Sequence, residues 1–229
     1  MKNRFFVANN ALRALSLFAA SKDEVRKYLQ GVWFEVSEGG QVRAVATDGH
    51  VVGVFSSDVP AETDVAVCVF VPTEVCRKLR KDTKTAAQHS RVVVDDEGKA
   101  TLTQVDDGSS FELRLRDGYK FCPPDWRRII PKTLPAGKVT RDRMIPFDPG
   151  LLGRVGEFAR IVSGSSAFAR IATDSREEWS NAVWTVNGHP EFFGLVAPLR
   201  TDIKSDHAGL ADAFARATAD QPAKRAKAA

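Results

Sequence analysis

One helix followed by about three strands recurs three times along this chain of 229 residues, and this repeat is the strongest constraint on its fold. Each copy has an extended start, then an amphipathic helix, then short strands rich in apolar residues. The first copy covers about residues 3–59, the second begins near residue 64, and the third follows a linker containing proline and glycine. Single helices packed on antiparallel strands predict an α+β fold of repeated units.

Local signals place the elements within each unit. Asn9 or Asn10 is expected to cap the first helix, and the Asp48-Gly49 pair predicts a hairpin turn because glycine adopts positive φ without steric cost. Pro72 suits the start of the second helix. The expected helices are 9–20, 73–83, 149–162 and a short one at 210–217. The expected extended segments are 26–36, 41–47, 51–56, 64–71, 91–95, 100–105, 110–116, 139–147, 167–173, 182–186 and 191–199.

Charge and hydropathy narrow the class of protein. The net charge of +4 and the pI of about 9.0 are compatible with a nucleic-acid partner without requiring one. No run approaches the 18 apolar residues of a membrane span, so no membrane role is expected. Polar residues interrupt the apolar stretch near the N-terminus, which argues against a signal peptide and favours a cytoplasmic protein.

The sequence offers little for catalysis. Asp48 and His50 lie close together, but their spacing is that of a hairpin turn, where Asp-Gly is favoured by backbone geometry. No phosphate-binding loop, dinucleotide fingerprint or metalloprotease motif is present. The cysteines and histidines have no metal-ligand spacing; they are Cys68, Cys76, Cys122, His50, His89, His189 and His207. We therefore expect no enzyme, no metal and no cofactor.

Four segments carry a family resemblance. They read DEVRKYLQGVWFE at 23–35, VATDGH at 45–50, PDWRRIIP at 124–131 and LVAPLR at 195–200. In order and spacing they are similar to segments of the bacterial sliding clamp, the beta subunit of DNA polymerase III. The resemblance implies the DNA-clamp fold of processivity factors, in which helices pack on antiparallel strands.

The resemblance also implies a domain plan. The family has three domains of two units each, and this chain resembles the middle domain joined to the second half of the last. Residues 1–131 would be a complete clamp-like domain, 132–200 half a domain, and 201–229 a partly disordered C-terminal extension. A chain of this shortened form is expected from a phage or mobile element. Twelve units complete the family's ring, so four chains would be needed, and we expect a homo-oligomer.

In the family, short peptides from polymerases and repair proteins bind a hydrophobic groove between the middle and last domains. Such grooves combine apolar pockets with a few polar groups that fix the register of the peptide. Matching the motifs residue by residue carries the groove onto Leu29, Thr47, Gly49, His50, Val51, Val52, Pro124, Arg128, Ile129, Asp148, Leu151, Leu195, Val196, Ala197, Pro198, Leu199 and Arg200. Packing between the first and third units is the alternative role of these residues.

Helices line the central hole of a clamp, where basic residues meet phosphates without reading the bases. The second helix fits this role, with five basic residues in the eight positions 77–84. The residues expected to face DNA are Arg13, Lys22, Arg26, Lys27, Arg77, Lys78, Arg80, Lys81, Lys84, Arg154 and Arg160. An ordinary solvated helix face is the alternative.

The resemblance thus implies a DNA replication protein that binds duplex DNA non-specifically and docks polymerase or repair-protein peptides as a processivity factor. A clamp loader is a further expected partner. The alternative is an adaptor or decoy that does not encircle DNA, keeps the peptide groove and competes for the partners of the host clamp.

Overall fold

The computed structural model describes residues 3–63, 65–83, 86–118, 121–130, 147–164, 169–172 and 181–198. Unit one comprises β1 (Asn3–Ala8), α1 (Asn9–Leu15), the 3-10 helices η1 (Ser16–Phe18) and η2 (Lys27–Leu29), β2 (Gly31–Val36), β3 (Val42–Thr47) and β4 (Val51–Ser56). Unit two comprises β5 (Val67–Pro72), α2 (Thr73–Lys78), β6 (His89–Val94), β7 (Ala100–Gln104) and β8 (Ser110–Leu115). The 3-10 helix η3 (Trp126–Ile129) precedes unit three, which comprises α3 (Pro149–Ser163), β9 (Ala169–Ala172), β10 (Ala182–Val186) and β11 (His189–Val196).

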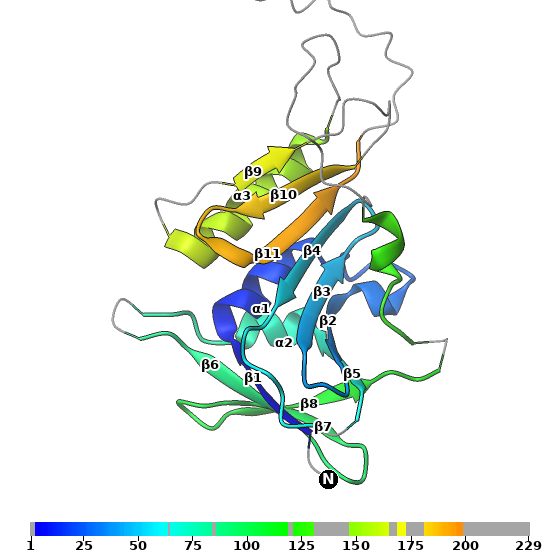
Figure 1. Cartoon of the computed structure of the whole chain (residues 1–229), viewed down its shortest axis with the longest axis vertical. Coiled ribbons are helices and arrows are strands. Elements are labelled where there is room, and N and C mark those ends of the chain that lie inside the picture. The colour runs from blue at the N-terminus through cyan, green and yellow to red at the C-terminus, as the bar shows by residue number, and fades with distance from the viewer. Residues whose placement is uncertain are drawn as a thin grey trace, which may run out of the picture.

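The strands form one continuous antiparallel sheet in the order β1-β6-β7-β8-β5-β2-β3-β4-β11-β10-β9. Unit three joins unit one where β11 pairs with β4, and we refer to this junction as the seam (Figure 1). At the seam, Gly194 of β11 lies directly opposite Gly53 of β4. The third unit is therefore attached through backbone hydrogen bonds as well as side-chain packing.

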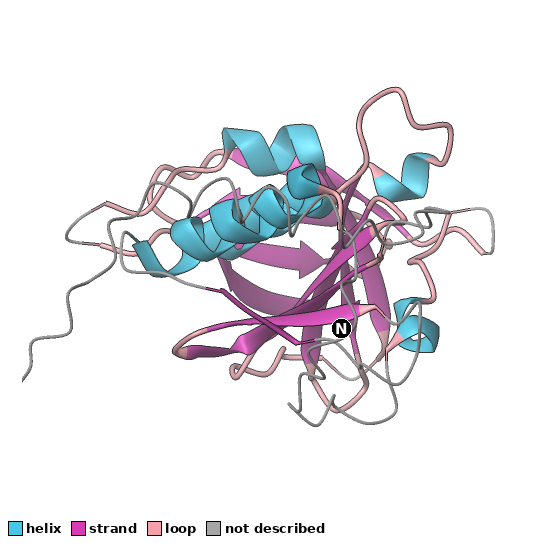
Figure 2. Ribbon diagram, turned by 90° about the horizontal axis from the view of Figure 1, so that it is seen from above, coloured by secondary structure: helices cyan, strands magenta, loops and turns pink. Residues whose placement is uncertain are grey.

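Alternation of side chains along the strands creates two apolar clusters on opposite faces of the sheet. On β2, Val32 and Phe34 point into the larger cluster, which also contains the helices, while Trp33 points into the smaller one. The view from above shows the longer helices together along one side of the strands (Figure 2). We call the two sides the helix face and the outer face.

An aromatic cluster fills the helix face behind the seam. Phe18, Phe158 and Trp184 are fully buried, and their ring centroids lie 5.1–5.2 Å apart. The space for these rings exists because Gly53 and Gly194 carry no Cβ atom. An added Cβ at Gly53 would overlap the ring of Phe18, and one at Gly194 would overlap Trp184 and the backbone oxygen of Val52.

The strands agree with the sequence patterns to within a few residues, except that the expected strand 26–36 is shortened to Gly31–Val36 because η2 occupies its start. The first helix was expected to reach residue 20, but α1 ends at Leu15 and continues as η1. This early end brings Phe18 into the aromatic cluster, where it is fully buried.

The capping prediction for the first helix was wrong. Ala8 occupies the N-cap position and has no side chain that could cap, while Asn9 is the first helical residue. Asn9 is buried, and its side chain forms hydrogen bonds with residues of β6 and β7. Its Oδ1 accepts from Ser90 Oγ at 2.6 Å, and its Nδ2 donates to Gln104 Oε1 at 3.4 Å. Pairing of this buried amide outweighs its capping preference.

The second helix was expected over 73–83, but α2 ends at Lys78. Leu79 turns to an extended conformation and is buried in the helix-face cluster. Gln104 Oε1 then accepts a hydrogen bond from the Arg80 N–H at 2.7 Å. Burial of Leu79 and this side-chain partner for the backbone explain why the helix stops early.

Several predicted features lie outside the described residues: residues 139–146 of the extended start of unit three, residues 167, 168 and 173 of the strand expected at 167–173, Leu199 and Arg200 of the groove, Lys84 of the basic set, and everything from residue 201 onward. In the part of the chain that the structure describes, no helix is long and apolar enough to cross a membrane.

Candidate peptide-binding site

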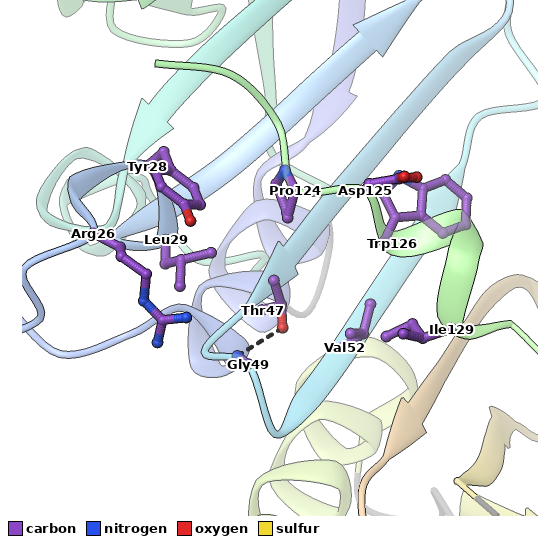
Figure 3. Close-up of a pocket in the computed structure, with 10 residues that line it drawn as sticks. All are labelled: Arg26, Tyr28, Leu29, Thr47, Gly49, Val52, Pro124, Asp125, Trp126 and Ile129. Carbon is purple, nitrogen blue, oxygen red and sulfur yellow. Dashed lines mark hydrogen bonds between the residues drawn. The ribbon is translucent and has the colours of Figure 1, made fainter. Parts of the chain in front are cut away.

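A cavity of about 290 Å³ opens on the outer face, beside the ends of β3 and β4 (Figure 3). Residues of η2 form one side and the segment leading into η3 forms the other, with the β3–β4 turn between them. Its lining residues are Arg26, Tyr28, Leu29, Thr47, Gly49, Val52, Pro124, Asp125, Trp126 and Ile129. Three stretches that are far apart in the sequence therefore converge on one cavity.

The cavity wall combines apolar side chains with polar groups in nearly equal share. Thr47 Oγ1 accepts a hydrogen bond from the Gly49 N–H at 3.0 Å, which shapes the turn. Gly49 has φ +99, a conformation that favours glycine. Ile129 is 45% exposed, so a large apolar side chain faces solvent at the rim. A wall in which fixed polar groups stand between apolar side chains is compatible with binding of an extended peptide.

A fixed positive charge stands on one side of the cavity. The Arg26 guanidinium donates to both carboxylate oxygens of Glu24, at 2.9 and 3.1 Å, and the Arg26 backbone N–H also donates to Glu24. The hydrogen bonds from the Arg26 side chain have the largest effect on the pKa of Glu24, followed by the one from the Arg26 backbone, and together they lower this pKa to about 2. The lowered pKa keeps the carboxylate ionised, and its ion pair with Arg26 intact, into the acidic range.

Asp48 ties the cavity to unit three. Its Oδ1 accepts from the backbone N–H groups of His50 and Val51, at 2.8 and 3.0 Å, and so fixes the turn that carries Gly49. Its Oδ2 accepts from Arg154 of α3 at 2.6 Å, and the Asp48 side chain is only 13% exposed. Asp48 thus acts as a structural link, with its carboxylate already bound by three donors.

Trp126 holds the segment before η3 on the outer face. Its side chain is buried in the outer-face cluster and its ring lies 6.1 Å from that of Phe193. The Arg127 guanidinium stacks 4.3 Å from the Trp126 ring centre and forms an ion pair with Glu35. Trp126 Nε1 has no hydrogen-bond partner among the described residues, so the indole acts here through its apolar surface.

The structure gathers part of the predicted groove around the cavity: Leu29, Thr47, Gly49, Val52, Pro124 and Ile129. Leu195 lies in the outer-face cluster next to Val52, and the Ala197 N–H donates to His50 O at 2.8 Å, so the end of β11 lies beside the turn. Val51, Leu151 and Val196 instead belong to the helix-face cluster, and Asp148 caps α3. Pro198 is half-buried, and Arg128 is exposed and forms an ion pair with Asp125.

Sequence reasoning missed Tyr28, Asp125 and Trp126 as lining residues and assigned Arg26 to DNA contact. All four lie within or beside the motifs that carried the resemblance. Their positions in the same short segments as Leu29 and Pro124 could have indicated that they line the same cavity.

The predicted DNA-facing residues differ in their surroundings. Arg77, Lys78 and Lys81 are exposed on or just after α2. The Arg13 guanidinium donates to the backbone oxygens of Arg77 and Leu79, at 3.3 and 2.8 Å, and so covers the end of α2. Among the described residues, further intramolecular contacts join Arg26 to Glu24, Lys27 to the Lys22 oxygen, Arg80 to Asp107, Arg154 to Asp48, and Arg160 to Glu157.

Known proteins similar to this chain share one family. Residues 8–119 match the family model described as DNA polymerase III beta subunit, central domain. The beta sliding clamp of Pseudomonas aeruginosa is 33% identical over 132 residues, which are 56% of this chain and 34% of that protein. That of Caulobacter vibrioides is 30% identical over 144 residues, 58% of this chain and 36% of that protein. The matches therefore span about a third of the length of these relatives.

Solved structures show the same fold. A crystal structure of the DNA polymerase sliding clamp from Pseudomonas aeruginosa matches with a TM-score of 0.54 at 20% identity, covering 86% of this chain and 67% of that chain. The Thermotoga maritima DNA polymerase III beta subunit matches with a TM-score of 0.50 at 14% identity, covering 86% and 65%. The clamp fold expected from the sequence is confirmed.

Proposed function

We propose that the chain is a non-catalytic replication protein of the sliding-clamp family, because its residues 8–119 match the central domain of the DNA polymerase III beta subunit and beta sliding clamps are its relatives. In this proposal it docks short peptides of polymerases or repair proteins in the outer-face cavity and meets duplex DNA with its helix face. The peptide-docking role is the part that the geometry supports best.

One observation carries the docking role. The cavity combines apolar side chains with fixed polar groups, and six of the residues that line it were matched to the family's groove from the sequence alone. The Glu24–Arg26 pair and the Asp48-bound turn hold two of its walls before any ligand arrives. Preformed walls lower the cost of ordering the site on binding.

Fluorescence anisotropy with a labelled peptide carrying the clamp-binding segment of a bacterial polymerase tests this role. We expect micromolar binding, weakened at least tenfold by Ile129→Asp, because a carboxylate would replace an exposed apolar contact at the rim. Val105→Asp is the matched control, since Val105 is a similarly exposed apolar residue just after β7 that does not line the cavity. Equal affinity of the two variants would count against docking in this cavity.

The DNA-binding role depends on the arrangement of the helices. The longer helices share one face, and α2 presents exposed Arg77 and Lys78 there, with Lys81 just beyond its end. Contacts of such residues with phosphates release counterions and make affinity fall steeply with salt. Recognition of this kind reads the charge of the backbone and not the base sequence.

Duplex binding measured at several salt concentrations tests this second role. We expect Arg77→Ala combined with Lys78→Ala to weaken binding and to reduce the slope of log affinity against log salt by about one for each phosphate that is no longer neutralised. Lys99→Ala is the control, because Lys99 is an exposed lysine in the β6–β7 turn. An unchanged slope in the double variant would remove α2 from the DNA-binding surface.

A second candidate function is the adaptor that keeps the peptide groove without encircling DNA. The observation that favours it is the engagement of Arg13, Arg80 and Arg154 in contacts within the chain, which compete with phosphates for their guanidinium groups. Peptide binding without salt-dependent DNA binding is the result expected of the adaptor.

A further inference from the structure

Four arginines lie together on the outer face of the sheet, where β8, β5, β2 and β3 run side by side (Figure 1). We call them the arginine patch, which consists of Arg43, Arg114, Arg116 and Arg127. Glu35 of β2 is two residues from the outer-face residue Trp33, so its side chain points to the same face, and Arg43 of β3 lies directly opposite it. Cys68 of β5 lies opposite Glu35 on the other side, and its backbone oxygen accepts from the Arg116 N–H at 3.1 Å. One row across four neighbouring strands therefore runs from Arg43 to Arg116.

Stacking and hydrogen bonds hold two of these guanidinium groups in place. The Arg127 guanidinium lies over the Trp126 ring and donates to both carboxylate oxygens of Glu35, at 2.5 and 3.2 Å. That of Arg114 lies 3.9 Å from the ring centre of Phe121. A guanidinium stacked on a ring keeps N–H groups at its edge for a further partner. The patch is therefore partly formed in advance, which lowers the cost of ordering it on binding.

The patch carries more positive charge than its own ion pairs compensate. The Glu35 side chain is 16% exposed and is already paired with Arg127. Among the described residues, no carboxylate forms an ion pair with Arg43, Arg114 or Arg116. Arg114 and Arg116 are exposed, and Arg43 is half-buried. An excess of one charge on a surface attracts a partner of the opposite charge, so the occupant that complements this patch is acidic.

The spacing within the patch matches an extended acidic peptide. Arg114 and Arg116 are two residues apart along β8, so their side chains leave the same face of the sheet about 6.6 Å apart. An extended peptide with carboxylates at alternate positions presents them at the same spacing. Proteins that bind single-stranded nucleic acids add exposed aromatic rings on which the bases stack. The rings beneath this patch, those of Phe121 and Trp126, are buried, which favours the peptide.

We propose that the arginine patch binds an acidic segment of a partner protein, in which Asp or Glu residues alternate along an extended chain. Each carboxylate accepts two N–H groups of one guanidinium, which is the strong geometry for this pair. The patch lies on the outer face, opposite the face assigned to duplex DNA. Arg127 follows Trp126, which lines the cavity, so one partner chain could reach both sites, but binding to the patch does not require the cavity.

Fluorescence anisotropy of the full chain with a labelled peptide that has Asp at alternate positions tests the proposal. We expect micromolar binding at low ionic strength that weakens as salt is added, and no binding of the same peptide with Asn in place of Asp. Arg43→Glu combined with Arg116→Glu is expected to weaken binding at least about tenfold, because two attractive charges become repulsive. Arg43→Gln combined with Arg116→Gln removes the charges without adding repulsion and is expected to give a smaller loss.

Arg91→Glu combined with Lys99→Glu is the matched control, because it changes the net charge by the same amount. Arg91 is an exposed residue of β6, two strands away from β8, and Lys99 is exposed in the β6–β7 turn. Screening by salt confines the effect of distant charges, so this variant is expected to change the affinity by less than about twofold. Circular dichroism of each variant separates loss of the patch from loss of folding.

Three results would overturn the proposal. The first is a wild type that does not bind the Asp peptide at low ionic strength, and the second is equal affinity in the patch variants and the control. The third is an oligothymidylate that binds the wild type more tightly than the Asp peptide does and loses its affinity in the patch variants, which would assign the patch to nucleic acid. The Asp peptide has no apolar side chains for the cavity, so this inference and the docking role succeed or fail separately.

Discussion

Gly194→Ala is expected to destabilise the protein by about 3 kcal/mol or more, at the upper end of the cost of overpacking a well-packed core. The added Cβ would overlap both the backbone oxygen of Val52 and the indole of Trp184. Neither can move away, because Val52 is held in the sheet and Trp184 is packed between Phe18 and Phe158. The seam would have to open for the methyl group to fit.

Guanidinium-induced unfolding measures this effect, and Gly153→Ala supplies the matched control. Gly153 is an exposed glycine within α3 whose added Cβ meets nothing within 4 Å. Alanine there is expected to stabilise the protein by up to about 1 kcal/mol, because it restores helix propensity. A Gly194→Ala variant as stable as the wild type would show that the strands at the seam can separate at little cost.

Trp126→Ala is expected to cost about 3–5 kcal/mol, the usual range for removing a buried large aromatic side chain. The side chain is 5% exposed and packs with Phe193 in the outer-face cluster, where it anchors the segment before η3. Its loss would also remove one wall of the cavity, so peptide affinity is expected to fall together with stability.

Trp126→Phe keeps an aromatic ring at this position but removes part of the buried volume. Because Nε1 has no partner among the described residues, phenylalanine gives up no hydrogen bond, and its cost is that of the smaller cavity, expected to be about half of the cost of alanine. Denaturant unfolding of the two variants side by side provides the measurement. A Phe variant as unstable as the Ala variant would mean that a single ring cannot replace the packing of the indole.

Local structure was largely readable from the sequence, because periodicity and turn chemistry act over a few residues. β4 was predicted with its observed bounds, and the Asp48-Gly49 turn has the positive φ at Gly49 that the residue pair indicates. The early ends of α1 and α2 were not readable. They depend on Phe18 and Leu79 being buried by segments that are distant in the sequence.

The site shows the same division between local and long-range information. The motifs placed Leu29, Thr47 and Pro124 together, because each lies in a segment that resembles the family. The partner of Arg154 could not be predicted, since 106 residues separate it from Asp48 and α3 reaches the turn through the pairing of β4 with β11 and through its packing on α1 and η1. Long-range pairings of this kind do not produce a periodic pattern in the sequence from which they could be predicted.

The seam also determines when, during synthesis, the open edge of β4 is covered and can no longer pair with other chains. The apolar β4 leaves the ribosome early, but the strand that covers its edge begins at His189, about 130 residues later. Because ribosomes synthesise about 5–20 residues per second, the edge of β4 stays unpaired for roughly 7 to 30 s before β11 is made. An uncovered apolar edge is a template for pairing with other chains. The nascent chain therefore needs protection over this interval, and slow translation of the second half would lengthen its exposure.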